Sequence, residues 1–174
     1  NTIYRLRHAA GKEVIVFEGD TIYQFNRDLD YEYDVEDFLK EIGLAQKAGV
    51  SPGAAHYRRA IKQYRGRYLP DVDLEWALIE RERLQQLYVN ALLAYAQLEF
   101  DNQVYHSAVT LAQQALVVDI CQEEAHRLLM RVYAAQRNPV LVIRQYEQCC
   151  KALLEELAAE PSIQTRALFL SLKG

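Results

Sequence analysis

Hydrophobic residues recur three or four positions apart along most of the chain from residue 34 onward. This spacing places their side chains on one face of a helix. Turn-forming residues and proline interrupt the pattern between the periodic segments. The pattern therefore predicts helices over 34–48, 51–64, 73–100, 104–118, 123–135, 140–157 and 162–172.

The longest of these predicted helices carries an apolar stripe that we expect to be buried. Its members are Trp76, Ile79, Leu84, Leu87, Tyr88, Ala91, Leu92, Tyr95 and Leu98. Four tyrosines lie on the apolar stripes of the predicted helices, namely Tyr95, Tyr105, Tyr133 and Tyr146. These side chains either line a ligand-binding groove or belong to the core, with each hydroxyl at the edge of the core. We prefer the core, because tyrosine combines a large apolar ring with one polar end.

The first 27 residues follow a different pattern. Residues 2–10 are typical of the end of a short helix, which Gly11 terminates. Residues 14–17 and 22–25 are rich in β-branched and aromatic side chains and predict two strands of a hairpin. A helix end and one hairpin cannot bury both of their faces, so we expect this segment to end a larger domain. The first residue is Asn1 and the single methionine is Met130, so we also expect the chain to belong to a longer protein.

An acidic segment lies between the hairpin and the helices. Residues 28–37 hold six acids and no base, which predicts a solvated linker, with Asp34 suited to begin the next helix. We therefore divide the chain into a terminal fragment over 1–27, a linker over 28–37 and a helical domain over 38–174.

The helical part contains an internal repeat. Shifting the chain by 35 residues places the helices before residue 119 on those that follow it, so that Leu93 falls on Leu128 and Ala108 on Ile143. This offset is close to the ~34-residue period of tetratricopeptide repeats, which are antiparallel helix pairs. One helix pair cannot cover its own apolar face, whereas stacked pairs can. We predict an all-α, tetratricopeptide-like solenoid with a small β appendage.

Several segments from residue 64 onward resemble the bacterial transcriptional activator domain found in antibiotic-regulatory activators. They are Tyr64-Arg-Gly-Arg-Tyr-Leu-Pro-Asp71, Trp76, Arg81-Glu-Arg-Leu84, Glu124-Ala-His-Arg-Leu-Leu-Met130, Gln145-Tyr-Glu147, Leu153-Leu-Glu-Glu-Leu157 and Glu160-Pro-Ser162. Each segment is ordinary, but their order and spacing are specific and cover about two-thirds of the chain.

The N-terminal segment resembles a second module. Tyr4-Arg-Leu-Arg7 is similar to the end of the recognition helix in a winged helix of the response-regulator type, and residues 14–25 are similar to its wing. In that family the winged helix directly precedes the activator domain. The resemblance implies a cytoplasmic regulator that binds promoter DNA, and whose helical domain self-associates, receives a signal or contacts the transcription machinery. The tip of the wing, Glu18-Gly-Asp20, is acidic where DNA contact favours arginine or lysine.

Two groups of cations are candidates for contacts with partners. The resemblance makes Arg5 and Arg7, and with less support Thr2, candidates for contact with DNA phosphates. A basic run without acids forms a possible interaction face, with Arg58, Arg59, Lys62 and Arg65 as its members. That run also fits a solvated helix face whose charges are balanced by nearby acids, and this is the interpretation that we prefer.

The remaining polar residues do not indicate catalysis. The four histidines are far apart in sequence, the three cysteines have no metal-ligand spacing, and no phosphate-binding glycine motif is present. We expect the polar run Glu123, Glu124, His126 and Arg127 to lie at the surface. A net charge of −4 argues against a chain that coats nucleic acid over its whole surface. We expect no enzymatic activity, cofactor, metal or membrane segment. The alternative function is a repeat adaptor that binds a protein or a small ligand and does not bind DNA.

Overall fold

The computed structural model describes residues 4–5, 8–9, 11–18, 22–48 and 50–173. The chain forms two compact units, Asn1–Tyr33 and Asp34–Gly174. In the first unit, strands β1 (Ile15–Glu18) and β2 (Ile22–Phe25) pair in an antiparallel sheet. Phe17 lies opposite Tyr23, and their rings make an edge-to-face contact with centroids 4.3 Å apart. The predicted hairpin is confirmed, with the first strand beginning one residue later than expected.

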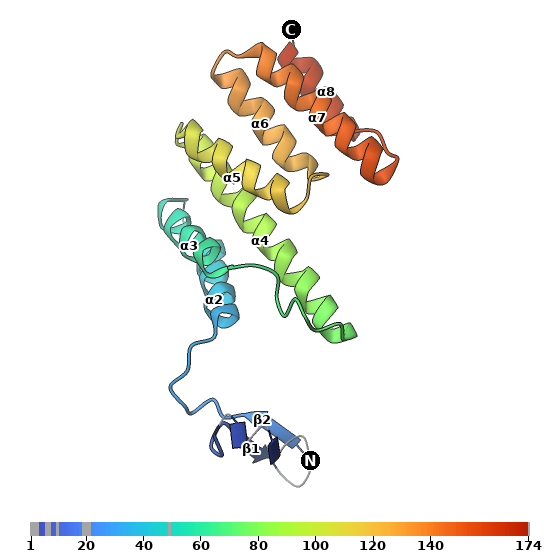
Figure 1. The fold of residues 1–174 in the computed structure, drawn as a ribbon. Helices are drawn as coiled ribbons and strands as arrows, with labels where there is room; N and C mark the ends of the chain where they lie inside the picture. Colours follow the sequence, from blue (N-terminus) through green and yellow to red (C-terminus); the bar gives the residue numbers. More distant parts are fainter. Residues whose placement is uncertain (1–3, 6–7, 10, 19–21, 49, 174) are drawn as a thin grey trace. The chain divides into compact units, whose positions relative to one another are not determined.

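The regular elements of the second unit are all helices in its described residues, joined by turns and by a longer loop between α3 and α4 (Figure 1). Its helices are α2 (Asp34–Lys47), α3 (Val50–Gln63), α4 (Glu75–Asp101), α5 (Tyr105–Val118), α6 (Glu123–Ala135), α7 (Pro139–Leu157) and α8 (Ile163–Lys173). All seven helices predicted for this unit are present, and each end lies within two residues of its predicted position. The first helix begins at Asp34, so the last four residues of the predicted linker are helical.

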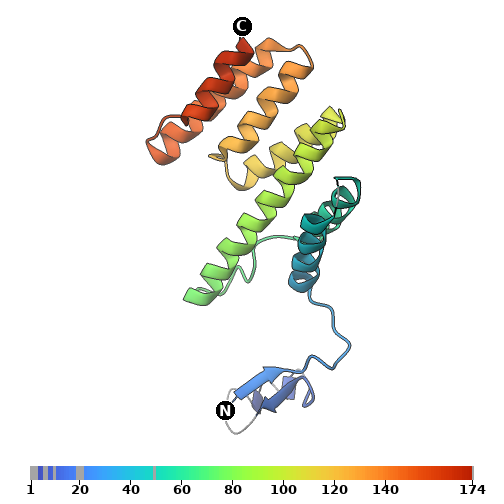
Figure 2. The same ribbon diagram turned by 180° about the vertical axis from the view of Figure 1, so that it is seen from behind.

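The helices pack as successive pairs. Helix α2 packs on α3, α4 on α5 and α6 on α7, and α8 contacts both α6 and α7 (Figures 1 and 2). Helix α4 also contacts α6. The α2–α3 pair is close, because a side chain on the buried Gly53 would lie 3.3 Å from the carbonyl oxygen of Ala45. Glycine at that position therefore permits the short distance between the two helices.

The turns between helices show the internal repeat most clearly. Gln103 and Arg137 both adopt a left-handed conformation, with φ of 61° and 56°. In both turns the next residue donates a backbone hydrogen bond five residues back, from Val104 to Glu99 (2.8 Å) and from Asn138 to Tyr133 (2.9 Å). These corresponding positions are 34 residues apart. The predicted offset of 35 residues is one too many for this turn. It aligns the buried Ala108 with the exposed Ile143, whereas an offset of 34 aligns Ala108 with the buried Val142.

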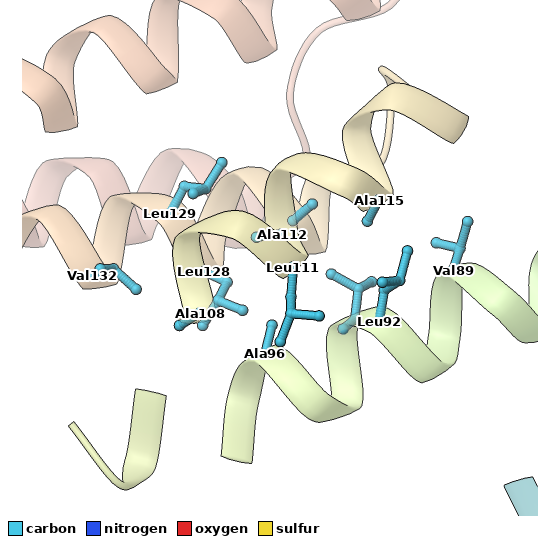
Figure 3. Close-up of a cluster of buried hydrophobic side chains, with 12 residues drawn as sticks. Val89, Leu92, Ala96, Ala108, Leu111, Ala112, Ala115, Leu128, Leu129 and Val132 are labelled. Carbon is cyan, nitrogen blue, oxygen red and sulfur yellow. The ribbon is translucent and has the colours of Figure 1, made fainter. Parts of the chain in front are cut away.

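The main core lies between α4, α5 and α6 (Figure 3). Small residues on α5, namely Ala108, Ala112 and Ala115, have no exposed surface and allow α4 to approach closely. Leu92 of α4 and Leu128 of α6 fill the space between them. Burying each such leucine stabilises the fold by about 1.5–3 kcal/mol.

A second core joins α2 and α3 to the middle of α4. It contains Phe38, Ile42, Ala60, Leu84 and Ala91. The partly buried side chains of Ile61 and Tyr88 pack against both cores, so the two are continuous through α4.

The prediction that the apolar stripe on α4 is buried is wrong for the first turns of the helix. Trp76 and Ile79 are 54% and 62% exposed, whereas Leu84, Ala91 and Leu92 are buried as expected. The residues that face inward in the first turns are Ala77 and Arg81, which lie four positions apart on the helix face that continues through Leu84.

The four tyrosines that allowed two interpretations are all partly buried. Tyr95, Tyr105 and Tyr133 pack against the main core, and the ring of Tyr146 stacks on Phe169 of α8 with centroids 4.0 Å apart. These contacts support their assignment to the core.

Candidate interaction surfaces

A buried arginine fixes the connection between α3 and α4. Arg81 is 8% exposed and donates hydrogen bonds to three backbone carbonyls of the preceding loop. Its Nε atom lies 2.7 Å from the oxygen of Tyr68, and its terminal nitrogen bonds the oxygens of Leu69 and, at 3.1 Å, Val72. Hydrogen bonds from a charged donor are stronger than neutral ones. The guanidinium therefore holds the loop against the first turns of α4.

The same loop contains two unusual backbone conformations. Leu69 has a φ of 42°, which a branched side chain rarely adopts, and Gly66 has a φ of 148°. Arg81 bonds the carbonyl of Leu69 itself, so the strained residue is held by the guanidinium. Tyr64-Arg-Gly-Arg-Tyr-Leu-Pro-Asp71 and Arg81-Glu-Arg-Leu84 are both motifs of the sequence, but no local pattern predicts the contact between them. Only the fold brings them together.

The predicted basic face lies on α3 and just beyond its end. Arg58, Arg59, Lys62 and Arg65 are all exposed. Arg59 donates from Nε to the carboxylate of Glu41 on α2 over 3.0 Å, and Nδ1 of His56 lies 2.7 Å from the same oxygen. Burial raises the pKa of Glu41, but the hydrogen bonds from His56 and Arg59 outweigh it, so the pKa lies below its usual value. One cation of the face is therefore balanced by an acid of the neighbouring helix.

This face borders a hollow of about 450 Å³ between α2 and α3. Its lining is charged or polar and consists of Asp37, Lys40, Glu41, Arg59, Lys62, Gln63 and Arg65. Four cations and two carboxylates meet there. We name these residues together with Arg58 the basic surface. Of the predicted members, Arg59, Lys62 and Arg65 line the hollow, and Arg58 does not.

The predicted DNA-contact residues lie in the first unit. Arg5 is helical and exposed, as is Tyr4, whose ring stacks on that of His8 with centroids 6.0 Å apart. Thr2 and Arg7 lie outside the described residues. The acidic tip of the predicted wing also falls mainly outside them, at residues 19–21.

The sequence predicts that the polar run at the start of α6 lies at the surface, and this prediction is wrong for His126. This side chain is 2% exposed and lies between α5 and α7. Its Nε2 lies 2.9 Å from the carbonyl oxygen of Ile120, and its Nδ1 lies 2.6 Å from the amide nitrogen of Gln145. A neutral ring with its hydrogen on Nε2 satisfies both bonds at once. Burial lowers the pKa of His126, which favours that neutral form.

Other members of the run join α6 to α8. Glu123 accepts hydrogen bonds from the backbone nitrogen and the hydroxyl of Ser162, at 2.9 and 2.8 Å. Arg127 donates to the hydroxyl of Thr165, which is fully buried, over 2.9 Å. Burial opposes ionisation of Glu123, but its hydrogen bonds to Thr165 and Ser162 and the charge of Arg127 lower its pKa overall. The run therefore holds the last helix in place.

A groove lies between α5 and α7, with residues of α6 at its base. Its volume is about 450 Å³. The base of the groove is formed by His126, Leu129 and Gln145. One wall is apolar and consists of Leu116, Val117 and Ile120, and the other is polar and consists of Gln148, Lys151 and Glu155. Val117 is 87% exposed, so apolar surface reaches the rim of the groove.

The remaining candidates for chemistry are inert or dispersed. Burial raises the pKa of the Cys149 thiol to about 12, so it stays protonated and unreactive near neutral pH. The three cysteines are free. Among the described residues, no group of three or more histidine, cysteine or acidic side chains could hold a metal ion. None of the helices in the part of the chain that the structure describes has the length and apolarity needed to cross a membrane.

The described helices of the second unit form packed pairs that expose charged and apolar surfaces. The family described as the bacterial transcriptional activator domain matches residues 33–173, and the chain belongs to this family. The match begins within one residue of the boundary between the two units. The family is a domain of bacterial transcriptional activators, which supports a role in transcription regulation for this chain. No curated protein matches the chain.

Proposed function

We propose that the helical unit is the regulatory and interaction domain of a DNA-binding transcriptional activator, and that it acts through protein contacts. The observation that carries this proposal is the basic surface at α2 and α3, which is exposed beside a hollow large enough to receive side chains of a partner. We also propose that the helix pairs form a tetratricopeptide-like solenoid, supported by the 34-residue repeat of the turns at Gln103 and Arg137.

The composition of the hollow favours an acidic protein partner over DNA. A surface that follows a phosphate backbone excludes carboxylates, because each one repels the phosphates. Asp37 and Glu41 both line the hollow, and Arg59 is already paired with Glu41. A protein surface can place its acids against Lys62 and Arg65 and still avoid Asp37. The transcription machinery or a second copy of the chain would be such a partner.

DNA contact is proposed for the first unit only. We propose that residues 1–27 end a winged helix, that residues 28–33, the part of the predicted linker before α2, link it to the helical domain, and that Arg5, Arg7 and Thr2 contact phosphates in a protein that carries the complete winged helix. The exposure of Arg5 on helical backbone is compatible with this role.

Promoter binding and transcription output test the two parts separately. We would compare the protein carrying a complete winged helix with this 174-residue chain across a salt series. We expect only the former to bind promoter DNA, with an affinity that falls steeply as salt rises. Failure of both on a pool of genomic fragments would contradict the proposal.

Charge reversal tests the basic surface. We expect the double variant Lys62→Glu, Arg65→Glu to retain promoter affinity within about twofold and to lose activated transcription, because only the protein contact is removed. The matched control is Arg137→Glu, Arg144→Glu, which reverses two exposed cations at the turn before α7 and on α7, outside both hollows. A parallel loss of promoter affinity in the Lys62 and Arg65 variant would show that the surface contacts DNA instead.

The groove between α5 and α7 favours a second candidate function, that of an adaptor which binds a ligand and not DNA. Its volume of about 450 Å³ lies in the range of small-molecule sites. The discriminating observation is the failure of DNA binding above, combined with ligand-dependent protection of the segment from Gln148 to Lys151 in the polar wall of the groove from hydrogen exchange.

A further inference from the structure

The first turns of α4 expose a concentration of large apolar side chains. Leu74, Trp76, Leu78 and Ile79 are 56%, 54%, 46% and 62% exposed. Single exposed apolar residues are common on soluble proteins, but contiguous groups mark sites of interaction. Trp76 and Ile79 lie three positions apart in the helix, so their side chains are neighbours. Leu74, the residue just before α4, and Leu78 lie four positions apart and form a second pair on the adjoining face. We name these four residues the α4 apolar surface.

The fold holds this surface in place. Ala77 has no exposed surface and Arg81 is nearly buried, so the inward face of these turns is packed while the outward face is free. The three hydrogen bonds of Arg81 attach the loop through Val72 to the same turns. The apolar residues are therefore displayed on ordered helix, and a partner would not have to order them on binding.

The charge around the surface is negative. Asp71, Asp73, Glu75 and Glu82 are exposed. The cations of this segment are Arg81, which is buried against carbonyl groups, and Arg83, which pairs with Glu80 at 2.7 Å. A partner with acids at its rim would be repelled, and one with lysines or arginines would be attracted.

We propose that the α4 apolar surface binds a protein partner whose apolar contact residues are surrounded by lysine or arginine side chains. Trp76 is the central anchor, because tryptophan is among the residues that contribute most to binding energy at interfaces. This contact is separate from the basic surface on α3, which selects the opposite charge. Its test therefore does not depend on DNA binding or on the proposed activator role.

The surface carries its own spectroscopic probe, because Trp76 is the single tryptophan of the chain. Two synthetic amphipathic peptides serve as ligands, one of leucine and lysine and one in which glutamate replaces each lysine. We expect the lysine peptide to shift Trp76 emission to shorter wavelength with saturation, and to bind more weakly at high salt. The glutamate peptide should leave the emission unchanged.

Two variants separate apolar from charged contributions. Ile79→Asp should weaken binding of the lysine peptide by about tenfold or more, as expected for the loss of a central contact. Glu75→Lys with Glu82→Lys should reverse the preference toward the glutamate peptide. The matched controls change exposed residues elsewhere: Leu170→Asp on α8, and Glu147→Lys with Glu156→Lys on α7. Circular dichroism confirms that each variant is folded.

Three outcomes would overturn the proposal. Equal shifts with both peptides would show an apolar contact without charge selection. An equal loss of binding in the control charge variants would show attraction to net charge alone. A shift in Trp76 emission that depends on protein concentration without peptide would show that a second copy covers the surface.

Discussion

The two halves of α4 show opposite ways of using apolar residues. In the C-terminal half, Leu92, Leu93 and Ala96 are buried against α5 and α6. In the first turns, Trp76 and Ile79 are exposed, and the buried positions are occupied by Ala77 and Arg81. The helix has 27 residues and is therefore about 40 Å long. The later turns are stabilised by apolar packing, and the first turns are held by the hydrogen bonds of Arg81 to a loop.

This difference teaches that burial on a long helix depends on which neighbours lie beside each turn. Apolar spacing continues from Trp76 to Leu98, yet only the later turns meet α5 and α6. A large apolar residue stabilises a fold only when other atoms cover it. The exposed turns are consequently available for binding, and the covered turns are not.

The largest effect should follow from truncation in the packed half. Leu92 has no exposed surface, and Leu92→Ala would leave a cavity between α4 and α5. From comparable substitutions we expect a loss of about 2–5 kcal/mol in the free energy of unfolding. Urea titration followed by circular dichroism measures it. A loss below about 1 kcal/mol would show that the core around Leu92 is loosely packed.

The next effect should follow from removal of the Arg81 side chain. Arg81→Ala leaves the carbonyls of Tyr68, Leu69 and Val72 without their donor. Hydrogen bonds to charged groups contribute about 1.5–3 kcal/mol, so we expect destabilisation of about that size. The control is Arg83→Ala, an exposed residue whose pair with Glu80 should contribute less than about 1 kcal/mol. Equal effects of the two variants would contradict the role assigned to Arg81.

The protonation of His126 should produce a smaller, pH-dependent effect. Because burial lowers its pKa in the folded state, the unfolded chain binds the proton more readily below the ordinary value of 6.5. Stability is then complete above that pH and falls as the pH decreases below it, by at most about 1.4 kcal/mol per pH unit. Acids with lowered pKa, such as Glu123, contribute only at lower pH, below their ordinary value of 4.5.

Unfolding of the wild type and of His126→Gln at pH 7.5 and 5.5 checks this prediction. The wild type should lose more stability than the variant between the two values, because only the wild type carries the titrating ring. Identical losses would assign the pH dependence to other groups.

The smallest effect on stability should come from the exposed turns of α4. Ile79→Ala should change the free energy of unfolding by less than about 0.5 kcal/mol, as is usual for surface substitutions. Set beside Leu92→Ala, this result measures the difference between the two halves directly. A loss comparable to that of Leu92 would place Ile79 in a covered environment.

Local patterns were sufficient for the secondary structure. Helical spacing, Asn138-Pro139 and Glu160-Pro161 identify every helix of the second unit to within two residues, because such signals act over a few neighbouring residues. Asn138 illustrates this, since its side chain accepts a hydrogen bond from the nitrogen of Leu141 over 3.2 Å at the start of α7. The basic run was also visible in the sequence, and α3 does expose it.

The contacts that define the surfaces required the tertiary structure. His126 and Gln145 are 19 positions apart, and Arg81 binds carbonyls up to 13 positions away, so neither pairing is contained in a local pattern. Whether Trp76 is covered depends on the direction of α2, α3 and α5 relative to α4. The order of apolar and polar residues therefore specifies which segments are helical, whereas burial and charge pairing arise only when the helices are packed, because they depend on neighbours distant in the chain.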